Sequence, residues 1–426
     1  MKKVGLVLGG GGTKGAYQAG AVKALQSLDK TWSIICGTSI GALNGAMLVQ
    51  EDYDEFYDLW TSVKAENIVN GAIDLNFDFE DVVSKPNSYL SFFRKYVGTT
   101  GADIQPLKNM MNYYFDKERF MASNIDYGCV IATYPGMRPV YITKKMMYER
   151  GIDYMLASSA CFPIFPTYKI DDNVYIDGGY ADNLPVDLAF ELGAQEIIAI
   201  DLIKSIAHPN LLNRENITYI YPRHEIGPLF NFDKELINKN IACGFNDVYK
   251  TYGLFSGYKY TFEKFDKPEF YDEFYIEILR LENKISRQLT FKDDAYITNH
   301  FLKVQHKAIL SSEDLGFGII DEIMSMLKMP VEEVYSFEKL CLLILETFKN
   351  AFSKDYEVLP SLSIEKLKEF IGNLDKIGMV SKIINQTLYP KKTVVKEEIL
   401  LSIAPIDVAI ASWIIHAVNY ITKKEI

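Results

Sequence analysis

A serine between two glycines is the first group in this chain whose surroundings suit covalent chemistry. Gly37, Ser39 and Gly41 follow a strand-like run at residues 33–36 and precede an alanine-containing apolar stretch at 42–49. Glycines on both sides relieve crowding at a sharp strand-to-helix turn and leave the serine hydroxyl exposed as a nucleophile. A lone match of this kind is more often a helix N-cap serine, so the neighbouring motifs must decide its role.

A glycine-rich loop precedes this serine. Gly10, Gly11 and Gly12 follow the first apolar run of the chain, and Lys14 and Gly15 lead into an alanine-rich stretch. A Walker-type phosphate loop needs glycine immediately before the lysine, where this chain has threonine. A dinucleotide fingerprint fits the glycine spacing, but the next strand should then end in an acidic residue, and it ends in the serine motif instead. Bare N–H groups at a helix N-terminus stabilise negative charge, so we favour an oxyanion hole built from the three glycines.

The base that would activate Ser39 is not an obvious histidine. The five histidines all lie late in the chain, at His208, His224, His300, His306 and His416. The first two have polar, proline-containing surroundings typical of surface loops. A Ser-His-Asp triad is therefore an open but unsupported alternative, and an SxxK arrangement is excluded because position 42 is alanine.

A carboxylate at the end of another strand-like run supplies a different base. Asp177 follows the run at residues 174–176 and is itself followed by Gly178 and Gly179. A lone Asp-Gly pair is usually a turn. Sites in open α/β sheets collect at strand ends, however, so in combination with the two glycine motifs we expect Asp177 to lie beside Ser39.

Taken together, these motifs resemble the patatin-like phospholipase family, bacterial branch. The match consists of Gly10, Gly11, Gly12, Lys14 and Gly15, then Gly37, Ser39 and Gly41, then Asp177, Gly178 and Gly179, with further stretches at residues 157–163 and 183–185. It covers roughly the first 260 residues. The family's usual cation in the glycine loop is arginine, and Lys14 cannot make the same bidentate contacts. The resemblance implies a Ser–Asp dyad, which agrees with the lack of an obvious histidine partner.

The resemblance also implies a lipid acyl hydrolase of the phospholipase A or lysophospholipase type. Asp177 would accept the proton of Ser39 as the hydroxyl attacks an ester carbonyl, and we expect burial to raise its pKa above the ordinary value of about 3.9. The amides of Gly11 and Gly12 would hold the oxyanion. No metal and no organic cofactor is needed. Thioester or small-ester hydrolysis on the same dyad, and a non-catalytic lipid-binding protein, are the alternatives.

Strand and helix patterns alternate through the first half of the chain. Apolar or β-branched runs predict strands, and helical spacing predicts helices at residues 16–28 and 42–49. The predicted strands are 4–8, 33–36, 129–133, 140–143, 174–176, 196–202 and 217–221. The tyrosine- and phenylalanine-rich region 52–120 is expected to be a helical insertion with loops. The alternation predicts an α/β fold with a mostly parallel sheet flanked by helices. The resemblance makes this a patatin-like three-layer sandwich, with residues 1–260 as the catalytic domain.

The pattern changes after about residue 260. Apolar residues then recur at helical spacing in three stripes, separated by prolines. The stripes are Phe274, Ile278, Leu281, Ile285 and Leu289; Ile364, Leu367, Ile371 and Leu374 behind a candidate N-cap, Ser363; and Ile406, Ile410, Trp413, Ala417 and Tyr420. We therefore expect residues 261–426 to form an all-helical C-terminal domain.

Composition and charge limit the partners. The net charge is −11, with 48% hydrophobic and 24% charged residues, as in a globular protein with a sizeable core. Such an acidic chain is not expected to bind nucleic acid. Contact with a lipid or acyl-ester substrate at a membrane would be peripheral and rest on apolar surface rather than charge. The five cysteines are widely spaced, so neither a disulfide framework nor a metal site is expected. No apolar run is long enough to span a bilayer, and we expect a cytoplasmic protein.

Overall fold

A computed structural model describes residues 2–422 apart from 71–101, 205–207, 213, 266, 288–294, 306, 308, 361 and 391–394. Much of the expected insertion at 52–120, and Leu289 of the first helical stripe, lie outside the described residues. The chain divides into two compact units, Met1–Thr251 and Tyr252–Ile426. Each unit is considered by itself below.

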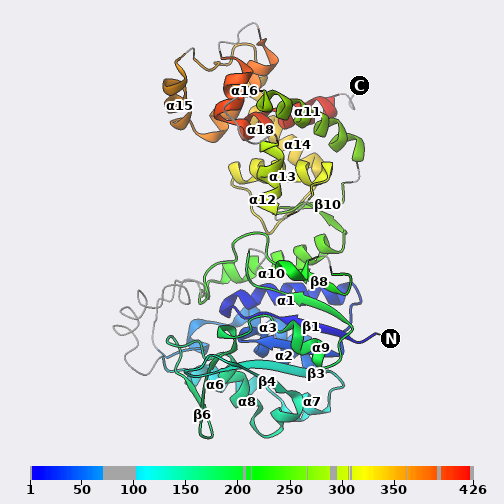
Figure 1. The fold of residues 1–426 in the computed structure, drawn as a ribbon, viewed down its shortest axis with the longest axis vertical. Helices are drawn as coiled ribbons and strands as arrows, with labels where there is room; N and C mark the ends of the chain where they lie inside the picture. The colour runs from blue at the N-terminus through cyan, green and yellow to red at the C-terminus, as the bar shows by residue number, and fades with distance from the viewer. Residues whose placement is uncertain are drawn as a thin grey trace. The chain divides into compact units, whose positions relative to one another are not determined.

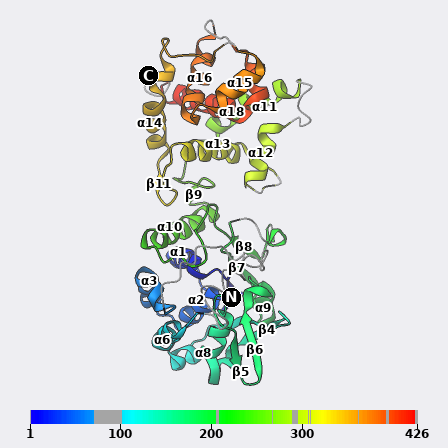
Figure 2. The same ribbon diagram turned by 90° about the vertical axis from the view of Figure 1, so that its left-hand side faces the viewer.

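The first unit is built on a sheet of eight described strands (Figures 1 and 2). The strands are β1 (Val4–Leu8), β2 (Ile34–Thr38), β3 (Asp126–Thr133), β4 (Pro139–Thr143), β5 (Tyr168–Ile170), β6 (Asn173–Asp177), β7 (Glu196–Ile200) and β8 (Ile217–Ile220). Their order is β5-β6-β3-β2-β1-β7-β8, with β4 paired to β3. The strands β3, β2, β1, β7 and β8 are parallel, whereas β4, β5 and β6 add antiparallel pairs. The predicted mostly parallel sheet is confirmed.

Helices cover both faces of this sheet, which explains why its central strands are continuously apolar. The helices are α1 (Gly15–Ser27), α2 (Ile40–Val49), α3 (Tyr53–Ser62), α6 (Gln105–Tyr114), α7 (Lys117–Ala122), α8 (Met147–Ser158), α9 (Val186–Glu191) and α10 (Lys234–Thr251). Val7 and Cys36 belong to the core cluster that includes α9. On the other face, Leu8 and Ile35 lie beneath Gly45 of α2. The three-layer arrangement expected from the resemblance is thus present.

The strands β2 and β6 lie end to end on the same side of β3, opposite β4. Residues 128–130 of β3 pair with β2 on one side and β4 on the other. Residues 131 and 132 pair with β4 and β6, so β6 must continue on the side that β2 occupies. Because β2 is parallel to β3 and β6 is antiparallel, their carboxyl ends face each other. Thr38 lies opposite Val130, and Asp177 lies opposite Ile131, the next residue along β3.

The second unit is predominantly helical, as expected, but it also contains a small sheet of two- and three-residue strands. Its helices are α11 (Pro268–Ser286), α12 (Tyr296–Gln305), α13 (Ser312–Met326), α14 (Phe337–Phe348), α15 (Ile364–Gly372), α16 (Lys376–Leu388), α17 (Glu397–Ile403) and α18 (Pro405–Thr422). The strands are β9 (Phe255–Ser256), β10 (Thr261–Glu263) and β11 (Val334–Tyr335), in the order β11-β10-β9. Residues of all three predicted stripes, such as Ile278, Leu367 and Trp413, are buried in one core. Ser363 precedes α15 as predicted, although its side chain makes no capping hydrogen bond.

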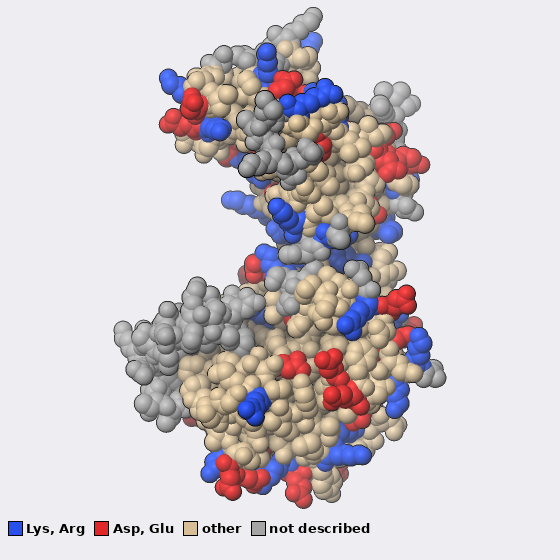
Figure 3. All heavy atoms as spheres, viewed as in Figure 1, with Lys and Arg blue, Asp and Glu red and all other residues tan. Residues whose placement is uncertain are grey.

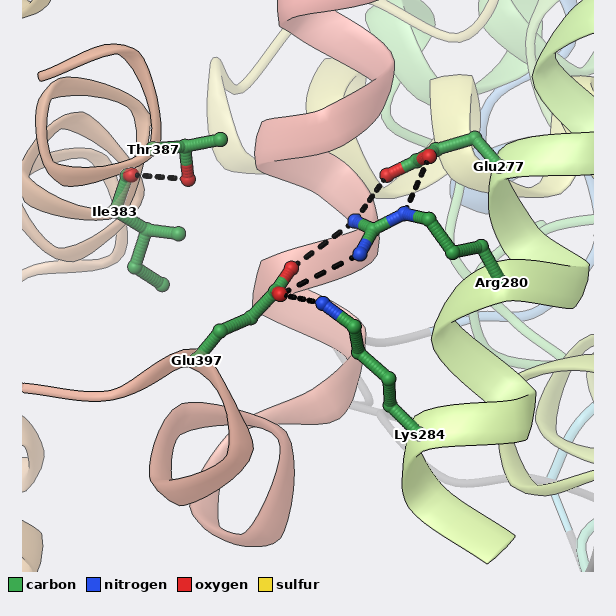
Figure 4. Close-up of polar contacts among 6 residues, drawn as sticks. All are labelled: Glu277, Arg280, Lys284, Ile383, Thr387 and Glu397. Atoms are coloured by element: carbon green, nitrogen blue, oxygen red, sulfur yellow. Dashed lines mark hydrogen bonds and ion pairs between the residues drawn. The ribbon is translucent and has the colours of Figure 1, made fainter. Parts of the chain in front are cut away.

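A charged cluster joins α11 to α17 inside this unit (Figure 4). Arg280 donates to Glu277 at 2.5 and 2.8 Å and to Glu397 at 3.0 Å, and Lys284 also pairs with Glu397. Burial raises the pKa of Glu397, but the two cations outweigh it and hold that pKa below the ordinary value. The cluster therefore stabilises the position of α17 while its carboxylate is ionised.

Candidate active site

Ser39 occupies a strained turn between β2 and α2. Its backbone angles are φ 55° and ψ −125°, in a region that favours glycine rather than residues with a side chain. The flanking glycines allow this turn because there is no room for a Cβ. One added at Gly41 would lie 2.2 Å from the Leu8 carbonyl oxygen, and one at Gly37 would lie 2.2 Å from the Gly41 carbonyl oxygen. The serine motif thus has the geometry of a nucleophile elbow.

The structure brings Asp177 to this serine. Ser39 Oγ donates a hydrogen bond to Asp177 Oδ2 at 2.6 Å, and the Gly179 amide donates to Asp177 Oδ1 at 2.8 Å. Asp177 is only 2% exposed. Burial raises its pKa from 3.8 to about 7, against the opposing effect of the two hydrogen bonds. Gly178 is required beside it because a Cβ there would meet the Val130 carbonyl oxygen at 2.2 Å.

The end of α8 holds both of these residues in place. Ser158 Oγ accepts from the Ser39 amide at 3.0 Å and donates to the Val130 carbonyl at 2.7 Å. The Ala160 carbonyl accepts from the Asp177 amide at 2.9 Å. The stretch 157–163, which the sequence singled out only by resemblance, therefore sets the backbone positions of Ser39 and Asp177.

The glycine loop passes next to Ser39. A Cβ added at Gly10 would lie 3.1 Å from the Ser39 Cβ, and Gly12 has a φ of 56° with the Leu229 carbonyl oxygen where its Cβ would be. The Gly10 amide already donates to the Asn183 carbonyl at 3.2 Å. Among the described residues, no acceptor bonds the Gly11 and Gly12 amides. Of the three glycines expected in the oxyanion hole, these two have N–H groups available for a ligand.

The remaining motif residues support the loop. Lys14 ends the short turn Gly12–Lys14 that leads into α1, and its amide donates to the Gly11 carbonyl at 3.1 Å. Gly15 begins α1 in close contact with α2 and α3, since a Cβ there would lie 2.6 Å from Ile40 Cγ1 and 2.8 Å from the Trp60 ring.

Neither histidine described in the first unit bonds Ser39 or Asp177. His208 is 4.0 Å from the buried Asp201, a different carboxylate at the end of β7. His224 is 5% exposed, so its expected position in a surface loop is wrong: the segment packs under α10, where Asn240 donates to the Ile226 carbonyl at 2.8 Å. His300 and His416 belong to the second unit, and His306 lies outside the described residues.

An apolar pocket opens from the Ser39–Asp177 pair. Its empty volume is about 910 Å³, counting the part that is open to solvent. Glycine-loop residues, Ser39, Asp177 and Asn183 form a polar part of its lining. Much of the rest is apolar and comes from α2, α3, α6 and their neighbours: Leu43, Met47, Leu59, Trp60, Val63, Ile68, Leu107, Met110 and Met111. Such a cavity suits a ligand with one reactive polar group and an apolar remainder.

A buried chain of polar side chains runs from the pocket wall to the glycine loop. Trp60 Nε1 donates to Asn44 Oδ1 at 3.0 Å, and Asn44 Nδ2 donates to Gln18 Oε1 at 2.8 Å. Gln18 Nε2 in turn donates to the Gly9 carbonyl at 2.8 Å. Sequence reasoning missed these residues, as well as the role of Ser158, because each becomes recognisable only when its distant partner is known.

Comparison with known proteins agrees with this geometry. The family model "Patatin-like phospholipase" matches residues 6–190. "Lysophospholipase nte1" of Aspergillus terreus is 29% identical over 204 residues, which are 47% of this chain and 12% of that protein. "Patatin-like phospholipase domain-containing protein 7" of Mus musculus is 29% identical over 202 residues, 47% of this chain and 13% of that protein. The chain thus spans about an eighth of the length of these relatives.

Solved structures show similarity at a low level only. "VipD from Legionella pneumophila" has a TM-score of 0.40 and 13% identity, covering 98% of this chain and 91% of that chain. The family match carries the assignment: it begins in β1, ends in α9, and contains the glycine loop, the serine motif and the Asp177 motif. Residues 6–190 of this chain are a patatin-like phospholipase domain.

Proposed function

We propose that this protein is a lipid acyl hydrolase that uses Ser39 as nucleophile and Asp177 as its base. The observation that carries the proposal is the 2.6 Å hydrogen bond between these side chains at the polar part of an apolar pocket. Every residue lining that pocket precedes the end of the first unit at Thr251. We therefore assign the activity to this unit.

The reaction begins with attack of Ser39 Oγ on the ester carbonyl carbon. Asp177 takes the hydroxyl proton as the new C–O bond forms, and the carbonyl oxygen becomes an oxyanion near the Gly11 and Gly12 amides. The intermediate then expels the alcohol, which takes the proton from Asp177. Water attacks the acyl-serine with Asp177 again accepting a proton, and the fatty acid leaves as Ser39 regains its hydrogen.

The relatives favour a phospholipid or lysophospholipid as the substrate. Their names include lysophospholipase and patatin-like phospholipase, and the apolar wall of the pocket is of the kind that an acyl chain requires. A thioester or a small ester could react on the same pair of side chains, so the leaving group must be tested directly.

Two substitutions test the assignment. Ser39→Ala should abolish release of fatty acid and labelling by a fluorophosphonate, because the attacking oxygen is gone. Asp177→Asn should abolish turnover, because the amide cannot accept the proton. Ser27→Ala, at a serine of α1 that bonds only locally and to Tyr249, is the matched control and should retain the wild-type rate. Full activity in either of the first two proteins would refute the dyad.

A substrate panel then separates the alternatives. Phospholipid, lysophospholipid, monoacylglycerol and acyl-CoA are compared in kcat/KM, each against Ser39→Ala. Preference for acyl-CoA would make the protein a thioesterase. Tight binding of lipid without any turnover or labelling would make it a lipid-binding protein.

A further inference from the structure

Asn183 is bound to the glycine loop at two points. Its backbone carbonyl accepts from the Gly10 amide at 3.2 Å, and its side-chain Nδ2 donates to the Gly10 carbonyl at 3.3 Å. The contact is close: a Cβ at Gly10 would lie 2.5 Å from Asn183 Oδ1. Asn183 also lines the pocket with Ser39 and Asp177. Neither the family assignment nor the proposed reaction gives this residue a role.

The bond to the Gly10 carbonyl determines the direction of a different group. A peptide unit is planar and trans, so the C=O of one residue and the N–H of the next point in opposite directions. The carbonyl of Gly10 and the amide of Gly11 belong to one such unit. Holding the carbonyl from one side therefore directs the Gly11 N–H toward the other side.

The next peptide unit is held in the same way. The Gly11 carbonyl accepts from the Lys14 amide at 3.1 Å, which directs the Gly12 N–H. This second anchor is a backbone bond, whereas the first depends on the Asn183 side chain. Glycine has little intrinsic preference among backbone conformations, so without an anchor a glycine loop can turn its amides away.

Asn183 is itself fixed to the strand that carries the nucleophile. Thr38 Oγ1 donates to the carbonyl of Asp182, the preceding residue, at 2.9 Å. The segment from Asp177 to Asn183 thus connects the base, the end of β2 and the glycine loop.

We infer that Asn183 is a positioning residue. Its side-chain amide orients the Gly11 N–H toward the oxyanion of the tetrahedral intermediate, in which the substrate is bonded to Ser39. The inference rests on the proposed hydrolase function. It concerns the transition state rather than substrate binding, because the charged oxygen exists only after Ser39 has attacked. Loss of the amide should therefore lower kcat and leave KM unchanged.

The test is Asn183→Leu, which keeps the approximate size of the side chain and removes its donor. We expect kcat to fall at least about tenfold, and at most by the roughly 100- to 1000-fold that loss of a whole oxyanion donor costs. A trifluoromethyl ketone that carries the substrate's acyl chain forms a tetrahedral oxyanion on serine. Its affinity should fall in proportion to kcat, while that of the matching fatty alcohol stays unchanged.

Asn385→Leu is the control. Asn385 is a fully buried asparagine whose side-chain amide, like that of Asn183, donates to backbone carbonyls, at 2.6 and 2.9 Å, but it lies in the helical unit. It should change stability without changing kcat. If circular dichroism shows that Asn183→Leu does not fold, Asn183→Asp, with the same shape and no amide donor, replaces it.

The outcomes separate the inference from the proposed function. Wild-type protein without turnover, or Ser39→Ala with full turnover, would overturn the hydrolase assignment itself. If wild type is active and Ser39→Ala is not, then wild-type kcat in the Asn183 variant overturns the inference alone. Parallel weakening of the fatty alcohol and the ketone also overturns it, because Asn183 would then shape the pocket rather than aim a donor.

Discussion

Asp177 is a carboxylate that combines deep burial with two hydrogen bonds from neutral groups. Among the described residues, no lysine or arginine pairs with it, so burial dominates and its pKa rises to about 7. Between pH 3.8 and about 7, the folded protein therefore keeps a proton on Asp177 that the unfolded chain has already released. Over that range this group's contribution to stability declines as the pH rises. In exchange, the carboxylate is a much stronger base than an exposed aspartate.

The raised pKa of Asp177 predicts the pH dependence of the reaction. Only ionised Asp177 can accept the Ser39 proton, so kcat/KM should increase tenfold per pH unit well below about 7 and level off above it. Initial rates with a soluble ester over a pH series would measure this. A plateau that extends down to pH 5 would contradict the prediction, because a base with an ordinary carboxyl pKa would then be at work.

At the scale of elements, features that depend on local sequence could be predicted, whereas features that depend on contacts between distant segments could not. The strands β1 and β2 are apolar on both faces because helices cover both, and that pattern is visible locally. The direction in which β6 pairs with β3 is not a local property. The motifs alone could therefore not show that Asp177 reaches Ser39 on an antiparallel strand. They could also not show the hydrogen bonds by which Ser158 and Asn183 hold the site.

The charged cluster between α11 and α17 allows a test of how much its ion pairs stabilise the packing of α17 (Figure 4). Glu397→Gln should lower the free energy of unfolding of the helical unit by roughly 1–2 kcal/mol, because Arg280 and Lys284 lose a charged partner. The pKa of Glu397 is lowered in the folded state. The effect should therefore be complete above the ordinary pKa of 4.5 and disappear as the pH falls through the lowered value.

Glu365→Gln is the control for this experiment. Both glutamates stand in the first turn of a helix, α15 and α17 respectively, so both interact with a helix dipole. Glu365 makes no ion pair with any residue in the described parts of the chain. Equal losses in urea unfolding of the two variants would mean that the cluster adds nothing beyond the dipole.

For the molecule as a whole, the net charge bears on how it can meet a lipid surface. None of the described helices is long and apolar enough to cross a membrane. The net charge is −11, and acidic and basic side chains are interspersed on the face that Figure 3 shows. Because an acidic protein is repelled by anionic lipid, we propose that contact with lipid depends on apolar side chains rather than on charge.

A salt series tests this proposal. Binding of the protein to anionic vesicles of phosphatidylcholine and phosphatidylglycerol should strengthen as salt is added, because screening weakens the repulsion between like charges. Binding to vesicles of phosphatidylcholine alone should change little. Sedimentation of the vesicles measures both. If salt instead weakens binding to the anionic vesicles, a local basic surface must dominate over the net charge.

The meeting of β2 and β6 on one edge of β3 has a consequence for how this site can vary. Ser39 and Asp177 are 138 positions apart in the chain. Their spacing is nevertheless set by two adjacent residues of β3, because Val130 pairs with the end of β2 and Ile131 with the end of β6. Loops elsewhere in that interval can lengthen or shorten without disturbing the pair. An extra residue inserted between Val130 and Ile131 would shift one partner by about 3.3 Å and turn it to the opposite face of the sheet. Insertions should therefore be tolerated in the loops of this interval, but not in β3 between its two partner strands or in the stretch 157–163 that holds both residues.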